Sequence, residues 1–256
     1  MHIRNQIAMI LAGAVLIIGS GCTNRTARDD SMIFDIQGPV AVDVESFNGD
    51  VRVIVDERLT EGRVQVTRTA DHGHRRWDDS LEALDSIDYS AELTSDARGP
   101  VLMVKTWSTH PESHYQRANV TIKLPGVSGL RVSTIRGEVR ATDTEGETSI
   151  ATQRGDVRFM TNRAMTAPVK ITAERGSIDY RVRGDSSGMI LADAADGEVM
   201  QRHKNAKMRI TEANGSHMVA ILNDGTNPIE LRSAEGDVRI AIVPDPTAVG
   251  VFIWSP

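Results

Sequence analysis

A short pattern centred on glycine recurs seven times and constrains the fold of this chain more than any other feature. Typical copies read S-F-N-G-D-V and T-Q-R-G-D-V, and from the second copy onward the glycines are 18, 21, 21, 18 and 21 residues apart. The repeat glycines are Gly49, Gly137, Gly155, Gly176, Gly197, Gly215 and Gly236. Such a period is typical of a solenoid, in which each unit buries its apolar face against neighbouring units.

Two apolar columns appear when the repeats are aligned on the glycine. The column five places before it contains Val44, Val132, Ile150, Ile171, Ala192, Ile210 and Leu231. The column two places after it contains Val51, Val139, Val157, Ile178, Val199, His217 and Val238. Alternation with polar positions and many β-branched residues predict a strand on each side of the glycine. Glycine suits the corner between them because it adopts positive φ without a steric penalty.

The repeats therefore predict an all-β fold, a single-stranded β-helix or solenoid of Gly-(Asp/Glu)-Val units. We expect the six units from Gly137 to Gly236 to stack in sequence order, about 4.8 Å apart, over roughly 30 Å. Val157, Ile178 and Val199 would then lie in adjacent coils. A β-sandwich of regular hairpins is the alternative. The solenoid is favoured because small and branched residues keep to separate columns.

The chain between the first and second repeats predicts further strands and a short helical insertion near residues 77–88. Trp77, Leu81 and Leu84 have helical spacing, with Asp78 or Asp79 as the N-cap. We expect this helix to cover an open end of the solenoid, since terminal strands need protection.

The N-terminus predicts a signal peptide and a lipid anchor. An apolar run from Ile7 to Ile18 is too short to span a bilayer and precedes Gly-Ser-Gly-Cys. Cys22 is the only cysteine, and its context resembles the lipobox of bacterial lipoproteins, with Gly19 in place of the usual leucine. We expect a lipid on Cys22 to hold the protein to a membrane of the cell envelope. Thr23 follows the cysteine, which by resemblance to sorting rules favours the outer membrane in a diderm organism.

Five segments are expected along the chain. They are a signal peptide at 1–21, a lipidated tether at 22–32, N-terminal β coils with the capping helix at 33–128, regular repeats at 129–243, and a C-terminal cap or truncated end at 244–256. Removing residues 1–21 takes away Arg4 and leaves 28 basic against 35 acidic residues. This acidic balance disfavours nucleic acid as a partner.

Charged residues follow the repeat glycines in a regular order and form a candidate surface charge ladder. An acid comes directly after the glycine and an arginine two places later. The members are Asp50, Glu138, Asp156, Glu198 and Asp237, with Arg52, Arg140, Arg158 and Arg239. Stacked carboxylates could bind a cation or act on a polysaccharide. Pairing of opposite charges on one outward face explains them more simply, so we expect Glu138 to face Arg140, Asp156 to face Arg158, and Asp237 to face Arg239.

Other motifs carry little chemistry. Two R-G-D tripeptides, at Arg154 and Arg183, consist of common residues, and the first coincides with a repeat glycine. His72 and His74 could approach His110 and His114, but a metal site needs three or four converging ligands. No hydrolase, metalloprotease or nucleotide-binding motif occurs. We therefore predict no catalytic residue, no metal site and no cofactor.

The stretch V-T-I-K-L-P at 120–125, followed by L-R-V-S-T-I-R-G-E-V, resembles the bacterial "putative adhesin" β-solenoid domain family over roughly residues 33–243. The resemblance implies an envelope protein of largely unknown function and supplies no catalytic residues. We expect a non-catalytic lipoprotein whose solenoid surface binds an envelope protein or a glycan, or acts as a scaffold. The alternative is a polysaccharide-active enzyme, a lyase or hydrolase, with its site on a solenoid face.

Overall fold

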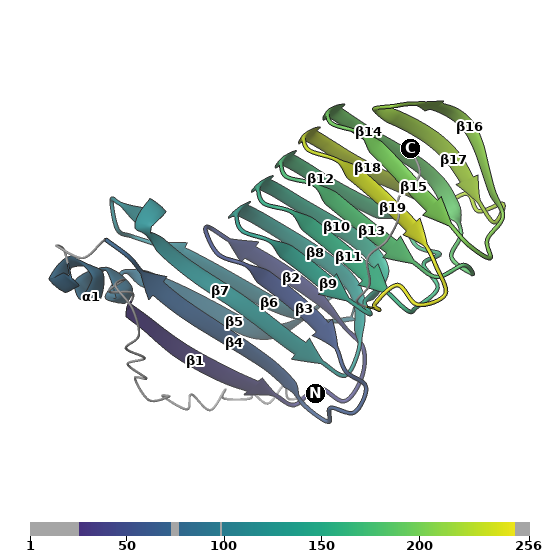
Figure 1. Ribbon diagram of the computed structural model, residues 1–256. Helices are drawn as coiled ribbons and strands as arrows, with labels where there is room; N and C mark the ends of the chain where they lie inside the picture. The colour runs from purple at the N-terminus through teal and green to yellow at the C-terminus, as the bar shows by residue number, and fades with distance from the viewer. Residues whose placement is uncertain (1–25, 73–76, 98, 249–256) are drawn as a thin grey trace.

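The computed structural model describes residues 26–248, except residues 73–76 and 98. Within these residues two large sheets face each other across one continuous hydrophobic core (Figure 1). Sheet A contains, in spatial order, β1 (Thr26–Phe34), β4 (Gly62–Ala70), β7 (Gln116–Leu124), β3 (Val51–Val55), β9 (Val139–Thr142), β11 (Val157–Thr161), β13 (Ile178–Val182), β19 (Val238–Ile242) and β15 (Val199–His203). Sheet B contains β5 (Ile87–Asp96), β6 (Gly99–Ser108), β2 (Val40–Ser46), β8 (Val127–Arg136), β10 (Glu145–Arg154), β12 (Val169–Arg175), β18 (Pro228–Glu235), β14 (Gly188–Asp196), β17 (His217–Leu222) and β16 (Met208–Asn214). The fold is an all-β solenoid, as the repeats predicted.

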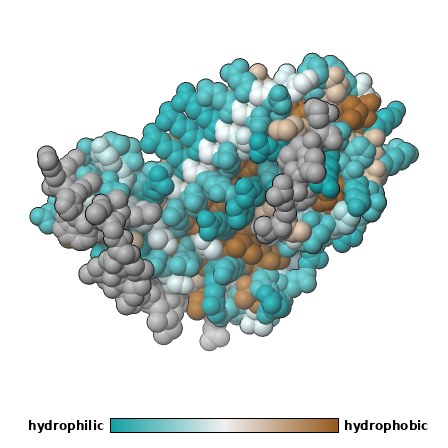
Figure 2. Space-filling view, viewed as in Figure 1, coloured by the Kyte–Doolittle hydropathy of each residue, from teal (hydrophilic) through white to brown (hydrophobic). Residues whose placement is uncertain are grey.

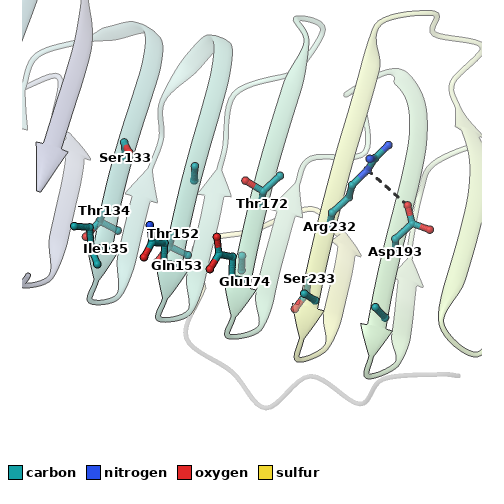
Figure 3. Close-up of a pocket in the computed structure, with 14 residues that line it drawn as sticks. Ser133, Thr134, Ile135, Thr152, Gln153, Thr172, Glu174, Asp193, Arg232 and Ser233 are labelled. Carbon is teal, nitrogen blue, oxygen red and sulfur yellow. Dashed lines mark ion pairs between the residues drawn. The ribbon is translucent and has the colours of Figure 1, made fainter. Parts of the chain in front are cut away.

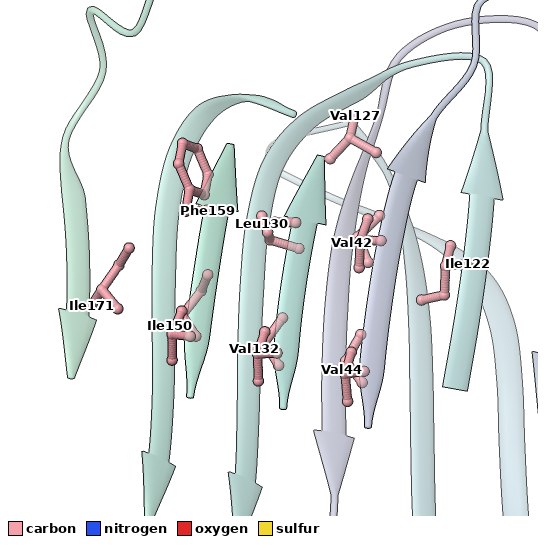
Figure 4. Packing of buried hydrophobic residues seen from close by; sticks show 14 of the residues in the cluster. Val42, Val44, Ile122, Val127, Leu130, Val132, Ile150, Phe159 and Ile171 are labelled. Atoms are coloured by element: carbon pink, nitrogen blue, oxygen red, sulfur yellow. The ribbon is translucent and has the colours of Figure 1, made fainter. Parts of the chain in front are cut away.

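Each regular unit passes from sheet B to sheet A at its glycine. In sheet B, Ile150 lies opposite Val132 on one side and Ile171 on the other, in parallel register. In sheet A, Val157 lies opposite Val139 and Ile178. All of these side chains are buried, and Figure 4 shows the sheet B column packed against the neighbouring strands. The two columns seen in the sequence are thus the two walls of the core.

Hydrogen bonds join the corners from one turn to the next. The N–H of Gly155, for example, donates to the carbonyl oxygen of Arg175 at 2.8 Å. Gly176 has φ +144°, and a Cβ on it would lie 2.2 Å from the carbonyl oxygen of Gly155. No side chain fits there, so glycine is required by both conformation and space.

The order in which the turns stack differs from the expected sequence order. Val157 and Ile178 are direct neighbours, but Ile178 then faces Val238, and Val238 faces Val199. The expectation that Ile178 and Val199 occupy adjacent coils is therefore wrong. β18 and β19 lie between β12 and β13 on one side and β14 and β15 on the other. The chain first skips one turn of the stack and later returns to fill it.

The unit at Gly215 does not form a turn of the stack. β16 and β17 form an antiparallel hairpin, and β17 pairs antiparallel with β14 at the end of sheet B. Gly215 therefore lies at a hairpin tip, where no other atom is within 4 Å of its Cβ position. The unit at Gly49 belongs to the stack instead, because β2 and β3 pair with β8 and β9 across 88 positions of sequence.

The helical insertion exists and is shorter than expected. α1 (Trp77–Asp85) lies against β1, β4 and β5 at the N-terminal end of the stack (Figure 1). Ala83 and Leu84 are buried there, whereas Leu81 is exposed. Asp78 and Asp79 lie inside the first turn rather than at the N-cap, and β5 already begins at Ile87. A short 3-10 helix, η1 (Ser113–Tyr115), precedes β7.

The expected tether from 22 to 32 is largely part of the folded domain. β1 begins at Thr26 and pairs antiparallel with β4 along its whole length, with Met32 and Phe34 facing the core. This segment forms a hydrogen-bonded strand and not a tether because the side chains of Met32 and Phe34 become buried when β1 pairs with β4. Cys22 and residues 249–256 lie outside the described residues. Among the described helices, none has the length and apolar character needed to span a membrane.

Candidate functional site

The acidic residues of the charge ladder lie at the corners, where they bond the backbone of the next turn. Asp50 Oδ1 accepts a hydrogen bond from the N–H of Glu138 at 3.0 Å. Asp156 Oδ1 accepts from the N–H of Ser177 at 2.8 Å, and Asp237 Oδ1 accepts from that of Glu198 at 3.2 Å. These three carboxylates therefore act as structural links between turns.

Uncharged residues extend the same series of links. Asn119 Oδ1 accepts from the N–H of Asp50 at 2.9 Å, and Ser177 Oγ accepts from the N–H of Asp237 at 3.2 Å. A short side chain with an oxygen acceptor is the shared property. Alignment of the repeats missed Asn119 because this residue follows no repeat glycine, and it passed over Ser177 because serine carries no charge.

The arginines partly follow the expected pairing. Arg140 pairs with Glu138 at 3.1 Å and Arg239 with Asp237 at 2.8 Å, whereas Arg52 stays 3.9 Å from Asp50. Arg158 does not pair with Asp156, contrary to the expectation. It lies 3.8 Å from Glu138 and 3.7 Å from Asp179, because the Asp156 carboxylate is turned toward the next corner.

Asp179 completes this network on sheet A. It pairs with Arg181 at 2.5 Å, and both side chains are only 14% exposed. Four ladder carboxylates, those of Asp50, Glu138, Asp156 and Asp237, thus contact an arginine or a backbone N–H. The exposed carboxylate of Glu198 has no such contact among the described residues. The paired carboxylates stabilise the stack, since charge-assisted hydrogen bonds join one turn to the next.

A groove on the outer face of sheet B is a better candidate site. It has a volume of about 590 Å³ and runs across β8, β10, β12, β18 and β14. Two outward rows of side chains line it. In one row the small residues Ser133, Ala151 and Thr172 are followed by Arg232 and Asp193, and in the other Ile135, Gln153 and Glu174 are followed by the small residues Ala234 and Ala195. Figure 3 shows these strands side by side, with Ile135, Gln153 and Glu174 near the corners. Sequence alignment did not single out this region, because its small outward residues carry no recognisable motif.

A charged cluster closes the end of the groove at β14 and β18. Arg232 lies 3.7 Å from Asp193, as the dashed line in Figure 3 marks, and 3.9 Å from Glu230. Asp193 Oδ1 is also 2.5 Å from Nδ1 of His217, the residue that interrupts an apolar column of the repeats. His217 faces Asp193 because β17 runs antiparallel beside β14. The cluster can orient a polar ligand that lies along the groove.

The histidines come together only in part. His72 is buried, and its ring centroid is 5.4 Å from that of His110 and 5.0 Å from that of Tyr115. The ring of His114 also lies against that of Tyr115, with centroids 4.0 Å apart. Among the described residues, no three His, Cys, Asp or Glu side chains are arranged to hold a metal ion. His74 lies outside the described residues.

Both R-G-D tripeptides are held by the fold. Gly155 of the first is a repeat corner, and Asp156 bonds to the next turn. In the second, Arg183 and Asp185 pair with each other at 2.8 Å. Neither presents an arginine and an aspartate free to bind a receptor together.

Comparison with known proteins supports the fold and leaves the ligand open. Residues 116–241 match the family described as Toastrack DUF4097. No curated protein matches the chain in sequence. A crystal structure from Clostridium sporogenes ATCC 15579, described as a "putative cell adhesion protein", superposes with a TM-score of 0.59 at 13% identity, over 84% of this chain and 99% of that one. At this identity the likeness establishes the fold alone.

Proposed function

Because residues 116–241 belong to the Toastrack DUF4097 family, we propose that the protein is a non-catalytic binding module of the cell envelope, anchored through Cys22. Its ligand is a linear glycan that lies in the groove of sheet B, across the strands. The groove, in which the small side chains of Ser133, Ala151 and Thr172 lead to the charged pair of Arg232 and Asp193, is the observation that carries this proposal. The description of the Clostridium sporogenes protein as a cell adhesion protein is consistent with it.

The position of the groove favours a glycan over a protein segment. A peptide that binds to a sheet by strand addition needs an edge with unpaired backbone groups. The groove lies in the middle of sheet B, where both neighbours of each strand are present. A ligand must therefore bind through side-chain hydroxyls, methyl groups and the charged cluster at Arg232 and Asp193. Ser133 and Thr172 offer hydroxyls, and strands about 4.8 Å apart present them at nearly regular intervals.

A substitution that fills the groove tests the proposal. Ala151→Trp on β10 should weaken retention of the full chain on immobilised envelope polysaccharide at least about tenfold, which corresponds to about 1.4 kcal/mol. Thr142→Trp, on the outer face of sheet A, is the matched control and should bind like the unsubstituted protein. Equal binding by all three proteins would refute the groove as the site.

A polysaccharide-active enzyme is the second candidate, and the contact between His217 and Asp193 is the observation that favours it. A carboxylate that orients a histidine is a common arrangement in general-base catalysis. The unsubstituted protein, His217→Gln and Asp193→Asn should be screened together against envelope polysaccharides. Turnover by the first that both substitutions abolish, with the fold intact by circular dichroism, would replace the binding module with the enzyme.

A further inference from the structure

Both ends of the solenoid leave a strand of sheet B with one unpaired edge. β5 is the last strand at the N-terminal end and β16 the last at the C-terminal end, and no described strand pairs with their outer edges. Unpaired edges are templates for strand addition by another chain. The exposed half of β5 runs from Glu92 to Asp96, away from α1, and β16 is exposed from Arg209 onward.

Core-facing apolar side chains are uncovered at both of these strands. Leu93 lies opposite the fully buried Leu102, so it points to the core face of sheet B, yet it is 38% exposed. Ile210 lies opposite the fully buried Ala220 and is 40% exposed. At the C-terminal end this happens because sheet B extends two strands beyond β14, whereas sheet A stops at β15. Figure 2 shows hydrophobic surface at that end of the molecule.

The two ends carry opposite charge. The N-terminal end, made of β1, α1 and β5, has nine acidic residues and one basic residue: Asp29, Asp30, Asp78, Asp79, Glu82, Asp85, Asp88, Glu92 and Asp96, with Arg28. The C-terminal end, from β15 through β16 and with Asp224 beside it, has four basic residues and two acidic residues: Arg202, Lys204, Lys207 and Arg209, with Glu212 and with Asp224, which pairs with Lys207 at 2.7 Å. If the charges served only to prevent pairing of these edges with other chains, any charge on both edges would suffice, and charges of the same sign would prevent it best. Opposite charges instead favour contact between the two ends.

We propose that copies of this chain associate end to end, with β16 of one copy beside β5 of the next. The occupant of each open edge is thus a second copy of this chain. β16 runs parallel to β14, and β5 runs antiparallel to the same set of strands, so copies in one orientation pair these edges antiparallel. Leu93 and Ile210 become covered along a shared core face. The contact joins two different surfaces, so it repeats from copy to copy in an open row.

At each end of the solenoid one sheet extends further than the other, and the longer sheet is sheet A at the N-terminal end and sheet B at the C-terminal end. At the N-terminal end sheet A extends three strands beyond β3 and sheet B two beyond β2, whereas at the C-terminal end only sheet B extends further. Between the regular turns of two joined copies, sheet B would therefore contain four strands, namely β17 and β16 of one copy and β5 and β6 of the next. Sheet A would contain three strands there, β1, β4 and β7. The net charge of −6 on the whole chain opposes association only weakly, since charges more than about 8 Å apart are screened at physiological salt.

Chemical cross-linking of the full chain in cell membranes tests this contact. In the antiparallel register that places Leu93 opposite Ile210, Ala91 on β5 lies opposite Ala213 on β16. Ala91→Cys and Ala213→Cys change no charge, and Cys22 is the only other cysteine. With a short bismaleimide, the chain that carries both substitutions should give a ladder of dimers, trimers and longer products. Each single variant should stay monomeric, and the two single variants expressed together should stop at the dimer. The parent chain, with Cys22 alone, is the background control.

Charge reversal tests the electrostatic part in the same assay. Glu92→Arg or Arg209→Glu, each in the chain with both cysteines, should lower the cross-linked fraction by about fivefold or more, and the two reversals together should restore it. Lys170→Glu, on the outer face of sheet B away from both ends, is the matched control and should change nothing. Dimers from a single-cysteine variant would indicate that like ends meet. That outcome, or the absence of any ladder, would overturn the proposal.

Discussion

Tyr180 combines deep burial with an unsatisfied polar atom. Its ring stacks on Phe159 of the neighbouring turn, with centroids 5.5 Å apart, and both side chains are fully buried. Among the described residues, no hydrogen-bond partner reaches its hydroxyl, and burial raises the pKa of this group. The ring of Tyr180 therefore stabilises the fold by filling the core, whereas its buried hydroxyl group, which has no hydrogen-bond partner among the described residues, lowers the free energy of unfolding.

Tyr180→Phe should raise the free energy of unfolding by about 1 kcal/mol, because it removes an unsatisfied buried hydroxyl and keeps the ring. Urea denaturation of both proteins measures the change. Phe159→Tyr is an informative companion, since it adds a second hydroxyl to the same layer and should destabilise. A loss of stability in Tyr180→Phe would show that the hydroxyl has a partner, such as a buried water.

The contact between Asp56 and Arg58 should be visible in the pKa of the Asp56 carboxyl group. The Arg58 side chain donates to both carboxylate oxygens of Asp56, at 2.8 and 2.9 Å, which lowers the pKa of Asp56 to about 2. Because the folded pKa lies below the unfolded value of about 3.9, this contact stabilises the fold above pH 4 and is lost as the pH falls toward 2.

Carboxyl chemical shifts followed by NMR from pH 6 to pH 2 measure the midpoint of Asp56 directly. Arg58→Gln should move that midpoint up toward the ordinary aspartate value. A midpoint near 4 for Asp56 in the unsubstituted protein would contradict the expected contact.

At the scale of the turn, identical repeat glycines have different roles. Gly176 has φ +144° and no room for a Cβ, whereas Gly215 sits at a hairpin tip in open space. Gly176→Ala should therefore destabilise the fold by about 3 kcal/mol or more, through strain and a forced shift of the neighbouring turn. Gly215→Ala, the matched control, should cost less than about 0.5 kcal/mol. Thermal unfolding of both variants measures the difference, and equal losses would argue against the stacked corners.

The repeats predicted the strands and the solenoid because the alternation of buried and exposed residues along a strand is visible in a short stretch of sequence. They could not predict that β18 and β19 fill a gap between earlier turns. Val199 and Val238 belong to the same apolar column, so either fits beside Ile178. The Gly215 hairpin was missed for a similar reason, although His217 in the apolar column was a visible sign. The groove arises from side chains of several turns, which no local motif describes.

For the whole molecule, the proposed lipid anchor on Cys22 would decide where the solenoid works. Only Thr23, Asn24 and Arg25 separate Cys22 from the start of β1. Fully extended, this stretch reaches about 14 Å, so a lipid on Cys22 would keep the N-terminal end of the domain close to the bilayer. Copies held in this way would meet at the membrane surface, where their concentration is raised.

Cys22→Ala should release the protein into the soluble envelope fraction or block its processing, because the thiol is the expected acylation site. Membrane fractionation and mass spectrometry of the mature N-terminus measure both outcomes. Cys22→Ser, which also lacks the thiol, should behave in the same way. Unchanged membrane association together with an unmodified N-terminus would refute the anchor.

The late return of the chain between β13 and β15 has a consequence for the timing of folding. In a simple solenoid each turn adds to the one before it, so folding can follow synthesis and export from one end to the other. Here β14 and β15 have no parallel neighbour until residues 228–242 arrive between them and β12 and β13. The two halves of the stack become one cooperative body only when this last pair inserts. Folding should therefore show a slow closing step, in which removal of β18 and β19 leaves two separate parts and not merely a shorter solenoid.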